Sequence, residues 1–145
     1  MDRVLLVLGA VAVAGVVAAA LGRRTAPPAA NTHHIPRQLD RSDFNGPTVP
    51  WLVAIFTSAT CSTCAGVVER ARLLASSEVE VQEVEVSADA ALHERYRIDG
   101  VPTLVVADAA GEVVESFLGP VTSADLWAAV AAARDAEPDA GSAER

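Results

Sequence analysis

Cys61 and Cys64 are the only cysteines of the chain, and two residues separate them. A pair of thiols at this spacing can close a small disulfide reversibly. The apolar run at residues 51–56 predicts a buried strand just before the pair, and residues 61–76 predict a helix that starts with it. The free N–H groups and the positive dipole end of a helix N-terminus favour thiolate over thiol. Because the thiolate is the nucleophile in disulfide exchange, this placement indicates redox chemistry.

Two other interpretations of the pair are a zinc site and an inert surface pair. Structural zinc normally takes four ligands, and the chain has no second CxxC motif; the adjacent His33 and His34 have no third ligand nearby. A secreted scaffold held together by disulfides would carry more than two cysteines. The sequence therefore predicts a functional pair, with no metal and no cofactor beyond its own dithiol.

The composition limits the possible partners and the number of domains. The chain has 145 residues and a formal net charge of −8, which argues against a nucleic-acid partner because the phosphates would repel it. Hydrophobic residues make up 51% of the chain, and much of that excess lies near the N-terminus. The remaining length suits one small domain.

Residues 4–21 are apolar and carry no charge. As a helix they would rise about 27 Å, close to the thickness of a bilayer core. We therefore predict a transmembrane anchor at residues 1–22, with a signal peptide cleaved at an A-x-A site at 18–20 as the alternative. Arg23 and Arg24 follow the apolar run, so the positive-inside rule favours a single-pass protein with its domain in the cytoplasm. An extracytoplasmic or secreted domain is the alternative.

Three further segments follow the anchor. Residues 23–36 are rich in proline and alanine and are predicted to be a linker, residues 37–135 the folded domain, and residues 136–145 a disordered acidic tail. Apolar periodicity predicts an α/β domain, a mixed sheet with helices on both faces, and His93 is expected to face solvent. The expected elements are a short strand at 38–39, a brief helix capped by Ser42 or Asp43, strands at 51–56, 79–86, 101–106 and 112–117, and helices at 61–76, 89–96 and 123–134, the last capped by Ser123.

Several motifs accompany the cysteine pair, in register along the chain. They are an apolar strand that ends at Phe56 five residues before Cys61, the segment YRIDGVPT at 96–103, and Gly119 after the last hairpin. Together with the CxxC motif, they resemble the thioredoxin family, whose pattern for the second motif is Y-x-I-x-x-I/V-P-T. The resemblance spans residues 37–134. It implies a thioredoxin-like fold, a central mixed sheet flanked by helices, and a protein disulfide oxidoreductase.

The resemblance also implies roles for single residues. Cys61 would be the attacking thiol and Cys64 the more buried resolving thiol. Pro102 resembles the family's cis-proline, which packs opposite the CxxC motif. A cis bond there would turn the Val101 backbone toward Cys61, where it could pair with a bound peptide like an added strand. Thr60, directly before the first cysteine, is the other candidate for substrate binding.

Five positions depart from the family's pattern. Thr60 replaces its usual Trp, Ser62-Thr63 its Gly-Pro, Ile55 its buried Asp and Glu83 its Lys. The two hydroxyls between the cysteines could donate hydrogen bonds to a Cys61 thiolate and lower its pKa. Strict alternation places Glu83 on the side of Val81, so we hypothesise that Glu83 takes over the acid/base role of the missing Asp. A solvated charge is the alternative.

The expected protein is a membrane-tethered thiol–disulfide oxidoreductase. Its expected partners are proteins that carry disulfides or dithiols, the membrane, and an electron donor or acceptor that the sequence does not identify. The alternative is a non-enzymatic interaction module of the same fold that partners a membrane protein, which Thr60 and the missing buried Asp allow.

Overall fold

The computed structural model describes residues 33–136 of the chain. Among these residues, no helix has both the length and the hydropathy that crossing a bilayer requires. The predicted anchor at residues 1–22 lies outside the described residues, as do most of the predicted linker and most of the predicted acidic tail.

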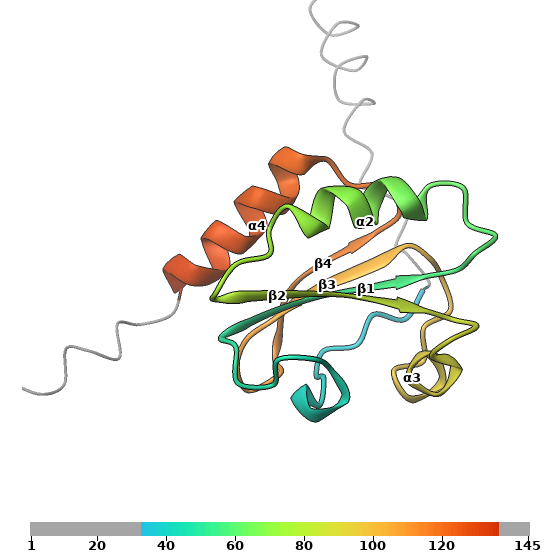
Figure 1. Cartoon of the computed structure of the whole chain (residues 1–145), viewed down its shortest axis with the longest axis horizontal. Helices are drawn as coiled ribbons and strands as arrows, with labels where there is room; N and C mark the ends of the chain where they lie inside the picture. Colours follow the sequence, from blue (N-terminus) through green and yellow to red (C-terminus); the bar gives the residue numbers. More distant parts are fainter. Residues whose placement is uncertain (1–32, 137–145) are drawn as a thin grey trace, which may run out of the picture. The chain divides into compact units, whose positions relative to one another are not determined.

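Within residues 33–136, four strands form one mixed sheet in the order β2-β1-β3-β4 (Figure 1). β1 pairs parallel with β2 and antiparallel with β3, which pairs antiparallel with β4. This arrangement confirms the predicted mixed sheet flanked by helices. The elements are η2 (Arg41–Asp43), a 3-10 turn, followed by β1 (Trp51–Thr57), α2 (Cys64–Arg72), β2 (Val79–Glu85), α3 (Ala90–Arg95), β3 (Thr103–Ala107), β4 (Val113–Leu118) and α4 (Ser123–Ala136).

The two faces of the sheet carry separate hydrophobic layers. α2 and α4 cover one face, and α3 and η2 lie on the other (Figure 1). All seven residues of β1 are buried, which explains the unbroken apolar run in the sequence. Alternate β1 residues face opposite layers, with Trp51, Val53 and Ile55 toward α2 and α4, and Leu52, Ala54 and Phe56 toward α3. The strand that leads to the cysteines is therefore fixed from both sides.

The chain before β1 differs from the prediction. Gln38 makes a single antiparallel bridge with Glu112 instead of starting a strand. The cap of η2 is Asp40, whose carboxylate accepts hydrogen bonds from the Ser42 N–H (3.0 Å) and the Ser42 hydroxyl (2.6 Å). The predicted caps, Ser42 and Asp43, are therefore wrong, because the turn begins earlier and both residues belong to it.

α4 is capped by Thr122 and not by the predicted Ser123. The Thr122 hydroxyl oxygen accepts the Asp125 N–H (3.2 Å), and the hydroxyl donates to the Asp125 carboxylate (2.6 Å). The Thr122 carbonyl accepts the Leu126 N–H (3.1 Å), which is the first bond of the helix. A side chain that satisfies a free N–H in the first turn is the usual N-cap arrangement.

We expect Thr122→Ala to lower the free energy of unfolding by about 1 kcal/mol, because the Asp125 N–H then loses its partner. Ser123→Ala is the matched control and should change the free energy by less than about 0.5 kcal/mol. Urea unfolding followed by tryptophan fluorescence compares the two variants. Equal losses in both, or a larger loss in the control, would contradict the assignment of the cap to Thr122.

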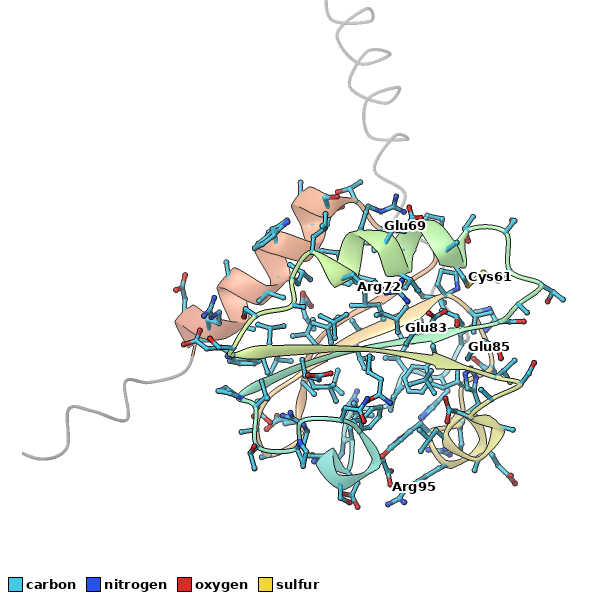
Figure 2. All side chains as sticks on the ribbon, in the orientation of Figure 1. Cys61, Glu69, Arg72, Glu83, Glu85 and Arg95 are labelled. Atoms are coloured by element: carbon cyan, nitrogen blue, oxygen red, sulfur yellow. A yellow bond between two sulfur atoms is a disulfide. The ribbon has the colours of Figure 1, made fainter. Side chains whose placement is uncertain are left out.

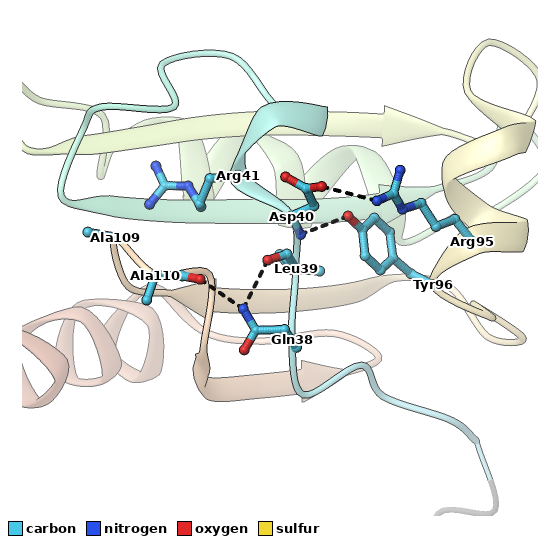
Figure 3. A pocket seen from close by; sticks show the side chains of 8 residues that line it. All are labelled: Gln38, Leu39, Asp40, Arg41, Arg95, Tyr96, Ala109 and Ala110. Carbon is cyan, nitrogen blue, oxygen red and sulfur yellow. Dashed lines mark hydrogen bonds and ion pairs between the residues drawn. The ribbon is translucent and has the colours of Figure 1, made fainter.

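A hollow of about 610 Å³ lies on the α3 face, between the segment before η2, the end of α3 and the turn that joins β3 to β4 (Figure 3). Most of its polar groups are paired, although the buried Arg41 Nε has no hydrogen-bond partner within residues 33–136. Gln38 Nε2 donates to the Ala110 carbonyl (2.8 Å), Arg95 pairs with the Asp40 carboxylate (3.1 Å), and the Tyr96 hydroxyl oxygen accepts the Asp40 N–H (3.0 Å). These hydrogen bonds and the ion pair join neighbouring segments of the fold, and no cysteine lines the hollow. The hollow is therefore not a candidate active site.

Tyr96 is the single tyrosine of the chain, so its ionisation can be measured directly. Burial raises its pKa, and its hydrogen bond to the Asp43 carboxylate adds to the rise, which reaches about 12. The stability that follows from this raised pKa is present below the ordinary value of 10.0 and is lost as the pH rises toward about 12. Titration of the phenolate absorbance tests this, and a midpoint at 10.0 in the folded protein would contradict it.

Candidate active site

The cysteine loop and the loop before β3 leave the sheet at the same edge. In the antiparallel pairing of β1 with β3, Phe56 lies opposite Thr103. The residues that follow β1 and those that precede β3 therefore lie side by side. Two hydrogen bonds hold the second loop: the Gly119 N–H donates to the Pro102 carbonyl (2.8 Å), and the Thr103 hydroxyl donates to the Gly100 carbonyl (2.7 Å).

Cys61 and Cys64 form a disulfide, with their Cα atoms 5.5 Å apart. Their exposure differs, because Cys64 is only 3% exposed whereas Cys61 is partly exposed. Cys64 is the first residue of α2 and belongs to its buried face, together with Val67 and Val68. Cys61 is therefore the cysteine that a molecule approaching from solvent can reach.

α2 begins at Cys64, with Thr63 as its N-cap residue, so the predicted helix start at Cys61 is wrong. Cys61 lies in the turn before the helix, where its N–H donates to the Ser58 carbonyl (3.0 Å) and its carbonyl accepts the Cys64 N–H (3.4 Å). The chain needs this turn to pass from the end of β1 into the helix. The Thr63 hydroxyl lies 3.7 Å from Cys61 Sγ, so the N-cap residue of α2 places a hydrogen-bond donor beside the outer sulfur.

The peptide bond between Val101 and Pro102 is cis, a point that the sequence alone left open. Pro102 is buried, whereas Val101 is partly exposed. Within residues 33–136, neither the N–H nor the carbonyl of Val101 has a hydrogen-bond partner. A backbone segment with both groups free is suited to pair with an extended peptide.

A cavity of about 200 Å³ lies beside these loops, lined by Ser58, Val86, His93, Ile98, Asp99, Gly100 and Val101. The expectation that His93 faces solvent is wrong, because this face of α3 packs on the sheet and leaves the residue 6% exposed. The His93 Nε2 atom lies 2.9 Å from the Val84 carbonyl, and the ring packs edge-on against Phe56 with their centroids 5.3 Å apart. The cavity thus combines apolar side chains with Ser58, Asp99 and one buried imidazole.

Thr60, the residue before the first cysteine, is exposed and makes its polar contacts inside its own loop. Its N–H donates to Ser58 Oγ (3.3 Å), and the two hydroxyl oxygens lie 3.1 Å apart. The thioredoxin pattern has a larger Trp at this position, and the role of Thr60 in substrate binding stays a prediction.

Glu85, at the end of β2, closes the other side of the cysteine loop. Its carboxylate accepts the N–H groups of Ala59 (3.0 Å) and Ser87 (2.8 Å). Burial acts to raise the pKa of Glu85, but these N–H donors outweigh it and hold the pKa below its usual value. Glu85 could not be identified from the sequence, because its place beside the cysteine loop depends on the parallel register, which ends β2 at Glu85 beside the end of β1 at Thr57.

Glu83 lies on the α2 face of the sheet, the side that the alternation indicates. Its carboxylate accepts the Thr57 hydroxyl (3.0 Å) and pairs with Arg72 of α2 (3.3 Å; Figure 2). The side chain is 36% exposed, so the charge lies at the rim of the α2 layer and not in its core. Neither of these contacts involves a cysteine, and the acid/base role of Glu83 stays a prediction.

Within residues 33–136, His, Cys, Asp and Glu side chains form no group of three that could hold a metal ion. The two adjacent histidines of the predicted linker instead bond to one carboxylate. His33 Nδ1 lies 3.1 Å from Asp99 Oδ1, and the His34 N–H donates to the same oxygen at 3.1 Å.

No family model and no curated protein matches the chain. Among solved structures, it is similar to a mutant thioredoxin from Halobacterium salinarum NRC-1, with 27% sequence identity over 55% of this chain and 71% of that chain and a TM-score of 0.49. It is also similar to a malarial protein, with 15% identity over 57% of this chain and 96% of that chain and a TM-score of 0.51. The second similarity concerns the fold alone.

The architecture itself matches the fold that the sequence resemblance implies. The strand order β2-β1-β3-β4, the parallel β1-α2-β2 unit and the terminal hairpin followed by α4 form a thioredoxin-like mixed sheet with helices on both faces. The cysteine pair lies at the junction of β1 and α2, as the resemblance implies.

Proposed function

We propose that the protein is a thiol–disulfide oxidoreductase that exchanges the Cys61–Cys64 dithiol or disulfide with protein or small thiol substrates. The observation that carries the proposal is the unequal exposure of a paired CxxC motif beside a loop with free backbone groups. Cys61 can be reached from solvent, Cys64 is 3% exposed, and Val101 lies at the same edge of the sheet. An inert structural disulfide would not require this arrangement.

In the proposed reaction the Cys61 thiolate attacks one sulfur of a substrate disulfide. The substrate S–S bond breaks, a mixed disulfide forms, and the leaving sulfur departs as a thiolate that takes a proton from solvent. The Cys64 thiolate then attacks Cys61 Sγ, which closes the intramolecular disulfide and releases the second substrate sulfur. The substrate gains two electrons and the protein loses two, so a dithiol or thiol partner must return them by the reverse exchange.

Two features support Cys61 as the attacking thiol. The N-terminus of α2 lies directly after the cysteine turn, and its dipole and free N–H groups favour a negative sulfur. The Thr63 hydroxyl, 3.7 Å from Cys61 Sγ, can donate a hydrogen bond to the thiolate. We propose that these two groups stabilise the Cys61 thiolate in this chain, where Ser62-Thr63 replaces the Gly-Pro of the thioredoxin pattern.

We propose that Val101, Pro102 and Thr60 form the substrate-binding surface. The free N–H and carbonyl of Val101 would pair with an extended substrate backbone as an added strand. Pro102 holds this segment against the sheet through its carbonyl, which accepts the Gly119 N–H at 2.8 Å. Thr60 is exposed directly before the outer cysteine, where a bound substrate would contact it.

Glu83 is the candidate acid/base group for the resolving step. Its replacement by glutamine keeps the hydrogen bond from Thr57 but removes the charge. Glu83→Gln should therefore lower the rate of disulfide reduction by about 10-fold, because a partly exposed carboxylate supplies less than a fully positioned general base, and it should shift the pH–rate profile. Arg72→Gln removes only the ion-pair partner and serves as the control. An unchanged pH–rate profile in Glu83→Gln would show that the carboxylate is a solvated charge.

We also propose that residues 1–22 tether the domain to a membrane as a single-pass protein, with the domain on the cytoplasmic side and an extracytoplasmic or secreted form as the alternative. The apolar run and the arginines that follow it support this orientation. Tethering would raise the effective concentration of the dithiol near membrane-bound partners. Mass spectrometry of the mature N-terminus distinguishes an anchored chain from a cleaved one.

Turnover of a protein disulfide tests the proposed activity. The reduced full-length chain should reduce insulin with dithiothreitol as the final donor, and Cys61→Ser should abolish the acceleration over dithiothreitol alone. Asp108→Ala, in the turn at the end of β3 opposite the cysteine loop, should retain it. A wild-type chain that does not exceed the dithiothreitol background would overturn the proposal and favour an interaction module.

A further inference from the structure

The last residues of the predicted linker are fastened to the loop before β3. His33 Nδ1 lies 3.1 Å from Asp99 Oδ1, and the His34 N–H donates to both carboxylate oxygens of Asp99, at 3.1 and 3.3 Å. The His34 N–H is the main group that holds the pKa of Asp99 below its usual value, and the hydrogen bond with His33 acts in the same direction. Asp99 is therefore ionised at neutral pH and binds two consecutive residues.

Residues 33–36 form a strap across this side of the domain. Ile35 packs against the hydrophobic layer of α3, and Pro36 is buried. At the other end the His33 ring lies directly over Gly100, where an added Cβ would come within 3.1 Å of Nδ1 and 3.3 Å of Cγ. The strap therefore contacts the domain at both ends, and the glycine provides the space for the ring.

The loop under the strap leads directly to the proposed substrate-binding residue. Asp99 and Gly100 precede Val101, and all three line the 200 Å³ cavity beside the cysteine loop. The Thr103 hydroxyl holds the Gly100 carbonyl (2.7 Å) from the sheet side. The strap holds Asp99 and Gly100 from the other side, so the path of the backbone into Val101 is fixed between the two.

We infer that Asp99 is a positioning residue, which holds the strap over Gly100 and thereby keeps the Val101 backbone in place for pairing with an extended polypeptide substrate. The inference rests on the proposed function and narrows its substrate class. A polypeptide would use the free N–H and carbonyl of Val101, whereas a small disulfide needs only access to Cys61. Loss of the strap should therefore affect the two kinds of substrate differently.

The test compares Asp99→Ala, His33→Ala and the double variant with unaltered full-length protein. KM and kcat are measured for insulin and for a small aromatic disulfide, and hydrogen exchange is measured over residues 99–103. Each single variant should raise KM for insulin about 5-fold with kcat unchanged, the size expected for an exposed charge-assisted contact. The double variant should be no worse than Asp99→Ala, because Asp99→Ala already removes the contact that His33→Ala breaks. His33→Gln, which retains a hydrogen-bond donor, should restore most of the affinity.

Asp108→Ala is the matched control, because the Asp108 carboxylate also accepts a backbone N–H, that of Glu112 (2.8 Å), in a turn at the other end of β3. It should alter neither KM nor exchange at residues 99–103. Equal effects on both substrates, additive losses in the double variant, or unchanged exchange in Asp99→Ala would overturn the inference while leaving the proposed function intact. Absence of turnover with both substrates in the unaltered protein would overturn the proposed function and the inference with it.

Discussion

The Cys64→Ser variant is expected to accumulate a mixed disulfide between Cys61 and its substrate. The first exchange needs only the exposed Cys61, but release of the substrate needs the Cys64 thiol, which is 3% exposed beneath it. Without that thiol the intermediate persists, and turnover should fall on the order of 1,000-fold. Non-reducing electrophoresis and mass spectrometry of the adduct measure the trapping, and in a lysate the same variant would capture the disulfide-bearing partners.

Cys61→Ser is the matched control, because it removes the outer sulfur and leaves the buried one. It should form little adduct and show the same loss of turnover. Stronger trapping by Cys61→Ser than by Cys64→Ser would contradict the assignment of the two roles. A Cys61→Ser variant that retains the protein's function in cells would favour the interaction module, in which the cysteines matter little.

Ile55→Asp is expected to have the largest effect on stability. Ile55 is fully buried in the layer between the sheet and the helices α2 and α4, beside Leu104 of β3. The thioredoxin pattern has a buried Asp at this position, but here Glu83 lies opposite on β2 and would repel a second carboxylate. Burying an unpaired carboxyl group should lower the free energy of unfolding by more than about 3 kcal/mol.

Ile55→Val keeps the apolar surface and should lower the free energy of unfolding by only about 1 kcal/mol. Urea unfolding of the reduced and oxidised forms compares the two variants. A similar loss in Ile55→Asp and Ile55→Val would mean that the site can solvate a carboxylate, and the proposed shift of the acid/base role to Glu83 would then lose its basis.

The strands could be predicted from the sequence because their patterns depend on the sheet alone. The unbroken apolar run of β1 reflects burial on both faces. The mixed apolar and polar pattern of β2 reflects a strand that contributes valines to both layers, Val79 to one and Val84 to the other, and leaves its glutamates partly exposed. The first residues of the helices were harder to predict from the sequence. Cys61 fits a helical pattern locally, yet the passage from β1 to α2 requires a turn that the pattern does not encode. Thr122 and Ser123 are both good caps, and only the path of the chain decides between them.

Sequence analysis identified the site residues that belong to a recognisable motif. The CxxC pair and the Val-Pro segment could be located from their types and spacing, whereas Glu85 and Asp99 could not. Both act as acceptors for backbone N–H groups of distant segments, Ala59 for Glu85 and His34 for Asp99, and such pairs depend on tertiary contacts. His93 was misplaced for a similar reason, since a polar residue in a short helix gives no sign of the sheet against which it packs.

The reduction potential of the Cys61–Cys64 couple tests the central claim most directly. The protein would be equilibrated in thiol buffers of defined ratio, quenched by alkylation, and the fraction of disulfide determined by mass spectrometry. We expect one reversible two-electron couple. Its reduction potential should lie between about −270 mV, as in thioredoxin, and about −120 mV, as in strong oxidants. A pair that cannot be reduced reversibly, or one with a potential below about −300 mV as in structural disulfides, would contradict it.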